Sequence, residues 1–158
     1  MIGGILVAGV GNILLGDDGF GVEVARRLAG EPMPEGASVA DFGIRGIHLA
    51  YQLLEGYDTL ILVDALARGE PPGTLYVMEP DVTGFPPRSF VDGHGLDPAT
   101  VLGMVDMLGG TVGRTIVVGC EPADITERIG LSAPVALAVD EAVRLVRRLV
   151  SEQKETSS

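Results

Sequence analysis

The chain has no tryptophan, its aromatic residues make up only 4% of 158 residues, and it has one cysteine and two histidines. A single cysteine cannot form an intramolecular disulfide or build a sulfur-rich metal site. Because aromatic residues are scarce, Val, Leu, Ile and Ala must fill the core, and 46% of the residues are hydrophobic. No uninterrupted apolar run reaches the roughly 18 residues of a membrane span.

Positive charge is also scarce, with 11 Lys and Arg against 22 Asp and Glu and a formal net charge of −11. This balance argues against nucleic acid and anionic membranes, whose phosphates attract Lys and Arg. A metal ion, another cation or a basic protein patch suits the acidic field better. The N-terminus lacks the basic region of a signal peptide. We therefore expect a cytoplasmic protein, and we expect it to be a monomer.

The length fits one domain. We assign residues 1–150 to a single α/β domain, and we expect residues 151–158, which are polar throughout, to form a disordered tail. Strands are predicted at 4–8, 38–41, 59–63, 73–78 and 114–118. Three of them are nearly continuous apolar runs, as is typical of parallel strands buried on both faces. The strand at 73–78 follows its predecessor too closely for a helix, which predicts an antiparallel pairing.

Helices alternate with these strands, at 21–28, 47–54, about 97–108 and 133–150. In the second helix Ile47, Ala50, Tyr51 and Leu54 share one face. The third opens with Asp97 as N-cap and Pro98 at the first helical position. The alternation predicts a three-layer α/β sandwich: a mostly parallel five-stranded sheet with one antiparallel strand, and helices on both faces.

The most informative segment is 9–21 (GVGNILLGDDGFG), where an apolar strand enters a glycine-rich turn and then an amphipathic helix. Polar groups at the carboxyl end of such a strand lie where α/β proteins form their sites. One carboxylate is enough to cap the helix, and we assign that role to Asp17. Asp18 is then either a second cap or a residue with a chemical role.

Two further residues belong with Asp18. Asp64 directly follows the third buried strand, and His94 lies between two glycines on a long connection from 79 to 95. Taken singly, Asp64 could cap the next structure and His94 could be an exposed loop residue. Together, two carboxylates and an imidazole form a plausible divalent-metal set, with coordination positions left open for water or substrate.

Two rival sites are weaker. A dinucleotide fingerprint would place its third glycine at Leu14, and Asp17 and Asp18 would repel a pyrophosphate at the helix start. Cys120 follows the last strand, where a free cysteine is more often a small buried hydrophobe than a nucleophile. His48, on the second helix, is expected at the surface.

The motif at 9–21 closely resembles the opening of the hydrogenase maturation endopeptidases. Further blocks match that family in the right order, at 63–65 (VDA), 92–94 (DGH), 119–122 (GCEP) and 130–132 (GLS). The resemblance implies a protease that trims a C-terminal extension from the large-subunit precursor of nickel–iron hydrogenase after nickel insertion.

The resemblance also implies a site. The metal-contacting and catalytic residues of the family correspond to Asp18, Asp64 and His94. Nickel would be supplied by the substrate, and other divalent metals could occupy the site in vitro.

The chain departs from the family at two places. The residue at the position of Asp18 is commonly Glu in relatives, so the reach of this ligand is shorter by one methylene. Residues 41–46 (DFGIRG) stand where many relatives carry Asp-Gly-Gly-Thr, in a segment that should border the substrate cleft. Two other functions stay open: a non-catalytic nickel-centre checkpoint or chaperone that binds the precursor, and a nucleotide-binding module.

Overall fold

The structure is a computed structural model that describes residues 4–79 and 98–156. Its strands are β1 (Ile5–Val10), β2 (Ala37–Gly43), β3 (Thr59–Ala65), β4 (Leu75–Met78) and β5 (Arg114–Cys120). Its helices are η1 (Gly16–Gly19, a 3₁₀ turn), α1 (Phe20–Ala29), α2 (Gly46–Leu53), α3 (Pro98–Met107) and α4 (Ala133–Thr156). The predicted strands and helices are confirmed, with ends that move by a few residues; the expected cap Asp97 lies outside the described residues.

The sheet has the strand order β2-β1-β3-β5-β4. The first three pairings are parallel, and β4 pairs with β5 in the antiparallel direction, as predicted. The chain moves from β1 outward to β2 and then returns to β3 on the other side of β1. Ligand sites of open α/β sheets form at such a reversal, at the carboxyl ends of the strands. The order therefore singles out the edge between β1 and β3.

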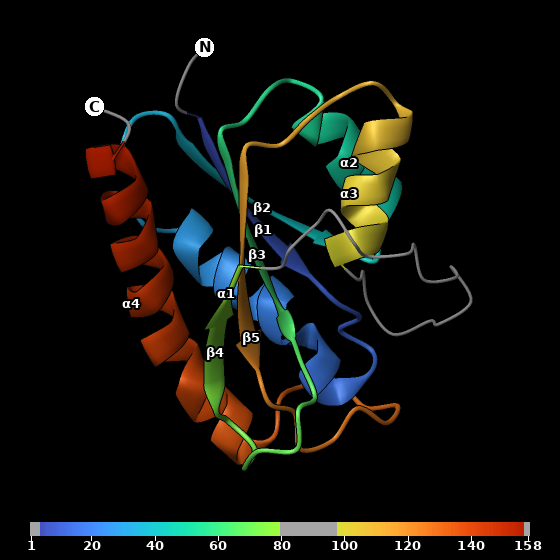
Figure 1. The fold of residues 1–158 in the computed structure, drawn as a ribbon. Helices are drawn as coiled ribbons and strands as arrows, with labels where there is room; N and C mark the ends of the chain where they lie inside the picture. Colours follow the sequence, from blue (N-terminus) through green and yellow to red (C-terminus); the bar gives the residue numbers. More distant parts are fainter. Residues whose placement is uncertain (1–3, 80–97, 157–158) are drawn as a thin grey trace.

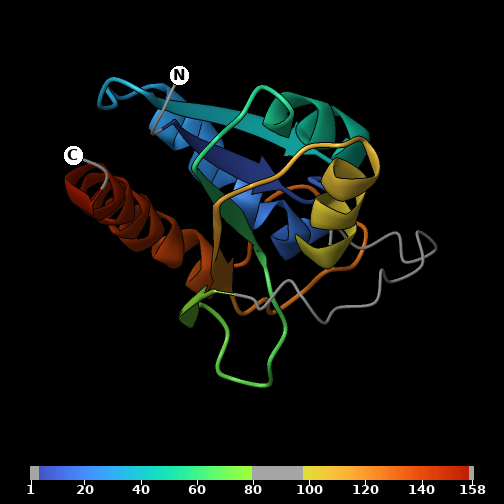
Figure 2. The same ribbon diagram turned by 45° about the horizontal axis from the view of Figure 1, so that its top comes forward.

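Helices cover both faces of the sheet, α1 and α4 on one side and α2 and α3 on the other (Figures 1 and 2). Successive residues of a strand point to opposite faces. In β1, Ile5 and Val7 accordingly pack with α1 and α4, while Leu6 and Ala8 pack with α2 and α3. The sandwich thus has two aliphatic cores, and this explains why β1, β3 and β5 are apolar without alternation.

The face of α2 that packs against the sheet is not the face that Ile47, Tyr51 and Leu54 share. Leu49, Ala50 and Leu53 are the residues that pack against the sheet. Ile47 and Tyr51 are more than half exposed, at 54% and 55%. Apolar side chains lie on more than one side of this helix, so their spacing in the sequence does not determine which side faces the core.

The prediction of a disordered tail from residue 151 was wrong for 151–156, because α4 continues to Thr156. Gln153 is buried, and its Oε1 accepts a hydrogen bond of 3.0 Å from Arg114. Lys154 donates to the backbone oxygen of Glu35, and the next residue, Gly36, accepts from the N–H of Ile5 at 2.9 Å. These contacts hold the last helical turn beside the beginning of β1.

Within the described residues, no helix is both long enough and apolar enough to cross a membrane.

Candidate functional site

Glycines bring α1 into direct contact with the sheet. A Cβ on Gly21 would lie 2.0 Å from the backbone oxygen of Val63, and one on Gly9 would lie 2.2 Å from the oxygen of Gly21. Only hydrogen fits at these two positions, so the backbones of α1, β1 and β3 touch. Gly9 therefore serves the close packing of α1 on β1.

The turn after β1 folds back on itself around Gly11. Its φ is +132°, and a Cβ there would lie 1.9 Å from the backbone oxygen of Asp18. The Asp18 side chain closes the turn, because its Oδ2 accepts a hydrogen bond of 2.8 Å from the N–H of Asn12. Asp18 is buried, with 6% of its surface exposed. The carboxylate is thereby fixed at the carboxyl end of β1.

Asp64 reaches the same turn from β3. A Cβ built on Gly11 would lie 3.5 Å from Asp64 Oδ1. Residues of β3 also contact residues of η1. Asp64 is half-buried, and its Oδ1 accepts a 2.8 Å hydrogen bond from the N–H of Ala65. The main chain of Asp18 and the side chain of Asp64 therefore both lie next to Gly11, at the reversal of strand order.

His94 lies outside the described residues, so its place beside the two carboxylates stays a prediction. Among residues 4–79 and 98–156, no group of three or more His, Cys, Asp and Glu side chains could hold a metal ion. The proposed set of Asp18, Asp64 and His94 needs its third member from the long connection. Two carboxylates and one imidazole are a donor set that suits borderline divalent metals.

Asp17 does not cap a helix, in contrast to the prediction. Its fully buried carboxylate accepts hydrogen bonds from the N–H groups of Ala123, Asp124 and Ser132, at 2.8, 2.9 and 2.7 Å, and from the Ser132 hydroxyl. Burial opposes ionisation, but these hydrogen bonds outweigh it and lower the pKa of Asp17 below its ordinary value. Asp17 therefore fixes the segment after β5 to the turn that carries Asp18.

Cys120 is the last residue of β5 and is fully buried. Burial, followed by the charges of Asp17 and Glu121, raises the pKa of its thiol to about 12. A thiol with that pKa does not form the thiolate that nucleophilic attack needs. Cys120 is the small buried hydrophobe that was predicted, and His48 is exposed, as expected.

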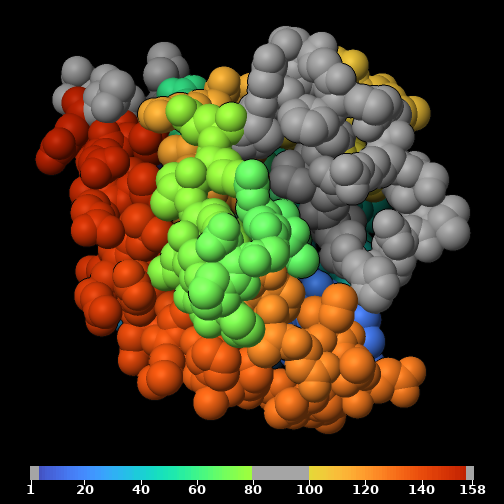
Figure 3. Space-filling view, turned by 60° about the horizontal axis from the view of Figure 1, so that its bottom comes forward, coloured from blue at the N-terminus to red at the C-terminus, as the bar shows by residue number. Residues whose placement is uncertain are grey.

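Sequence reasoning missed Glu121, the next residue along the chain. Its buried carboxylate accepts from the Tyr76 hydroxyl at 2.6 Å and from the N–H of Arg68 at 2.7 Å. The Tyr76 hydrogen bond is the largest cause of a lowered pKa at Glu121, while burial and then Glu121 raise the pKa of Tyr76 to about 12. Figure 3 shows the result, with residues 66–74 packed against the segment that follows β5. A charged residue directly after a buried strand was the available signal.

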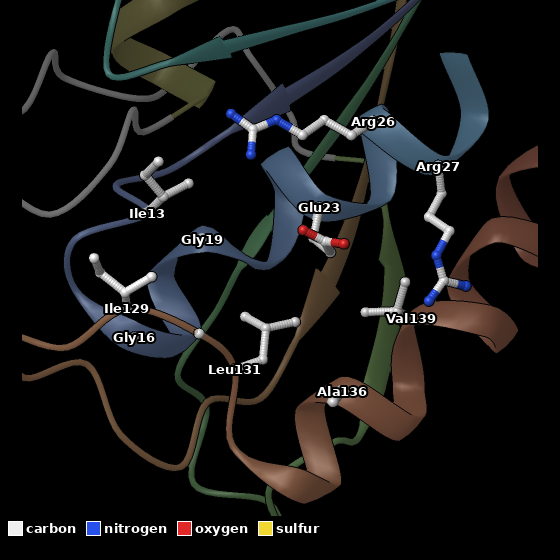
Figure 4. A pocket seen from close by; sticks show the side chains of 11 residues that line it. Ile13, Gly16, Gly19, Glu23, Arg26, Arg27, Ile129, Leu131, Ala136 and Val139 are labelled. Atoms are coloured by element: carbon white, nitrogen blue, oxygen red, sulfur yellow. The ribbon is translucent and has the colours of Figure 1, made fainter. Parts of the chain in front are cut away.

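A cavity of about 350 Å³ lies on the α1–α4 side of the sheet. Its apolar lining comes mainly from Ile13, Ile129, Leu131 and Val139, with Arg26 and Arg27 at the rim (Figure 4). Arg26 forms an ion pair with Asp41 at 3.6 Å, and Arg27 forms one with Asp140. Neither Asp18 nor Asp64 lines this cavity, so it is separate from the candidate site.

Comparison with known proteins identifies the family. The sequence model described as hydrogenase maturation protease matches residues 22–149. A hydrogenase expression/formation protein HupD of Rhizobium leguminosarum bv. viciae is 35% identical over 150 residues, covering 90% of this chain and 74% of that protein. A putative hydrogenase maturation protease of Methanocaldococcus jannaschii is 34% identical over 146 residues, with 90% and 93% covered.

Solved structures agree with the sequence relatives. The hydrogenase maturating endopeptidase HybD of E. coli is 27% identical, with a TM-score of 0.77 over 94% of this chain and 93% of that one. The similarity therefore extends over both layers of helices and the whole sheet. The chain belongs to the hydrogenase maturation protease family.

Proposed function

We propose that the chain is the endopeptidase that removes the C-terminal extension from the nickel-loaded large-subunit precursor of a nickel–iron hydrogenase. Family membership supports the class of reaction, and one structural observation supports the place. The backbone oxygen of Asp18 and the carboxylate of Asp64 both lie next to Gly11, at the carboxyl edge between β1 and β3. A monomeric enzyme acting in the cytoplasm remains part of this proposal.

Asp18, Asp64 and His94 recognise the nickel centre of the substrate in this proposal. The nickel is part of the substrate, so the enzyme need not hold a resident metal. Two carboxylates held by backbone hydrogen bonds are already oriented before the substrate arrives. Their contact with nickel holds the scissile peptide bond beside the site.

Water is the nucleophile in the hydrolysis that we propose. Cys120 is buried with a pKa raised to about 12, and Ser132 donates its hydroxyl proton to Asp17. Neither side chain is therefore prepared to attack a carbonyl carbon. Attack of water on the peptide carbonyl releases the extension and leaves a new C-terminus on the large subunit.

The test is trimming of purified nickel-loaded precursor, followed by gel mobility and intact mass. We expect Asp18→Asn, Asp64→Asn and His94→Ala to lower the trimming rate at least about 100-fold, since even outer partners of metal ligands typically cost 10–100-fold. Precursor without nickel should stay uncut. Exposed Asp140→Asn is the matched carboxylate control and should trim like the wild type.

Cys120→Ala separates water from a thiol nucleophile and should retain trimming. Circular dichroism of each variant shows that the fold is kept. Normal trimming by a folded His94→Ala variant would contradict nickel recognition by this set. Binding of the precursor by the wild type without any trimming would instead favour the checkpoint alternative.

A further inference from the structure

Asp17 directly precedes Asp18 in the chain and is the more deeply buried of the two. None of the Asp17 surface is exposed, against 6% for Asp18. Its carboxylate accepts four hydrogen bonds, from the N–H groups of Ala123, Asp124 and Ser132 and from the Ser132 hydroxyl. Burying a charge costs free energy unless hydrogen bonds compensate it, and these four do so. The proposed function so far gives this carboxylate no part.

The donors to Asp17 all lie on residues 123–132, which follow β5 and are 106 to 115 residues away along the chain. The backbones are close as well, because a Cβ on Gly16 would lie 2.6 Å from the backbone oxygen of Asp124. One side of the turn that carries Asp18 is therefore attached to this distant segment. Main-chain hydrogen bonds of 2.8, 2.8 and 3.1 Å run from the N–H of Gly16 to Arg128, from that of Asp17 to Asp124 and from that of Arg128 to Leu14.

A second set of contacts joins the same turn to the end of β1. Asp18 Oδ2 accepts a hydrogen bond of 2.8 Å from the N–H of Asn12, and the backbone oxygen of Asp18 lies against Gly11. Between the two attachments lies η1, a single 3₁₀ turn of four residues. A helix this short is not stable in isolation. Its neighbours therefore determine where η1 lies, and with it the carboxylate of Asp18.

We propose that Asp17 is a positioning residue for the trimming reaction: it holds η1 against residues 123–132 and thereby sets the position of the Asp18 carboxylate. The inference rests on the proposed function, in which Asp18 contacts the nickel centre of the substrate. A displacement of about 1 Å at such a group can lower a reaction rate about 100-fold. The attachment of the turn to a distant segment therefore serves catalysis as well as the fold.

The test compares Asp17→Asn with the wild type at a temperature where urea unfolding shows both to be folded. The amide NH2 cannot accept a hydrogen bond, so the variant loses part of the attachment to residues 123–132. With nickel-loaded precursor, kcat should fall about 10–100-fold, the range found for groups that support metal ligands. Steady-state trimming, followed by gel mobility, measures this change.

Hydrogen exchange measured by NMR gives a second readout, which a loss of stability alone does not move. The N–H of Asn12 donates to Asp18, whereas that of the neighbouring Gly11 donates to the backbone oxygen of Gly43. Global unfolding exposes both amides equally, while displacement of Asp18 frees only the amide of Asn12. The exchange rate of Asn12 relative to Gly11 should therefore rise at least about tenfold in Asp17→Asn, the factor expected for a lost hydrogen bond to a charged group.

Two control variants separate positioning from stability. Leu28→Ala removes a fully buried side chain near the end of α1 and should destabilise the protein. It should nevertheless leave kcat and the exchange ratio within about twofold of the wild type, because it does not touch the turn. Thr126→Ala removes a hydroxyl of residues 123–132 that donates to Asp124, and it should leave both readouts unchanged.

The inference requires both changes in Asp17→Asn. A folded variant that changes only one readout, or neither, beside an active wild type would overturn the inference and leave the proposed function standing. If the variant does not fold, Ser132→Ala takes its place, because it removes one of the four hydrogen bonds to Asp17 and should change both readouts in the same direction. A wild type that does not trim the precursor would instead contradict the proposed function, and with it the role of Asp17 in trimming.

Discussion

Asp17 and Asp18 are neighbours in the chain, but their carboxylates serve different purposes because the turn points them to different partners. Asp17 is bound by the segment after β5, whereas Asp18 closes its own turn through Asn12. The partners of Asp17 are 106 to 115 residues away, so a local reading of the sequence cannot find them. The partner of Asp18 is six residues away, and a glycine-rich turn predicts such a local contact.

We expect Asp17→Asn to lower the free energy of unfolding by about 2–3 kcal/mol, the range for hydrogen bonds to a charged group. The NH2 of the new amide would replace one carboxylate oxygen and cannot accept a hydrogen bond, so it would face either the N–H groups of Ala123 and Asp124 or the N–H of Ser132. Urea unfolding measures the change. Asp140→Asn removes an exposed carboxylate that pairs with Arg27 at the surface, and it should change stability by less than about 1 kcal/mol.

The comparison of wild type with Asp17→Asn also gives a prediction about pH. The pKa of Asp17 is lowered in the folded protein from an ordinary value of 3.8. An ionised carboxylate whose pKa is lower in the folded than in the unfolded state stabilises the folded protein. This stabilisation is complete above the unfolded-state pKa and is lost as the pH falls through the folded-state pKa. The difference in unfolding free energy between wild type and Asp17→Asn should therefore be constant from pH 7 to pH 5. It should shrink below pH 3.8, and a difference that grows with acid would contradict the assigned role.

The close contact of α1 with the sheet depends on Gly9 and Gly21. A side chain at either position should push the helix away from the sheet. In Gly21→Ala the methyl group would meet the backbone oxygen of Val63 at 2.0 Å, so α1 must move away from β3. We expect a loss of about 3 kcal/mol in unfolding free energy, at the upper end for overpacking. Thermal and urea unfolding measure it.

Gly103→Ala is the matched control. Gly103 lies inside α3, and nothing lies within 4 Å of the place that a Cβ would take there. Alanine at this position should stabilise the protein by about 0.5–1 kcal/mol through its higher helix propensity. Equal effects of the two substitutions would show that Gly21 is not a packing glycine.

The strands and most helix positions could be predicted from the sequence because buried parallel strands leave a strong apolar signal, as in β3. The orientation of α2 could not be predicted from the sequence. Ile47 and Leu49 are both strongly apolar, and only packing against the sheet decides which of them is buried. The end of α4 was missed because its last turn is polar. A contact with Arg114, far along the chain, holds that turn.

Candidate site residues could be predicted from the sequence where they directly follow a buried strand. The hydrogen-bond partners of these residues could not be predicted. Asp64 was predicted as a site residue because a carboxylate directly after an apolar run stands out in the sequence. Glu121 stands in the same position after β5, but it braces residues 66–74 through Arg68 and Tyr76. Local sequence does not separate these two uses of a carboxylate, since only the distant partners differ.

Two aliphatic cores pack on the two faces of the sheet along the whole molecule. Ile61 and Val63 belong to one core and Leu60 and Leu62 to the other, all almost fully buried. We expect the protein to keep its melting temperature in excess chelator, because folding does not depend on metal as it does in small zinc domains. Calorimetry with and without chelator measures this, and unfolding at moderate temperature after chelation would contradict it.

The contacts of Lys154 with Glu35 and of Ile5 with Gly36 place the beginning of β1 and the end of α4 at the same end of the molecule. Asp18 and Asp64 lie at the opposite end, where the parallel strands finish (Figure 1). A purification tag, a fluorescent fusion or a tether to a solid support, attached through a short linker at either terminus, therefore faces away from the incoming substrate. The protein can therefore be immobilised through either terminus with the candidate site turned away from the support.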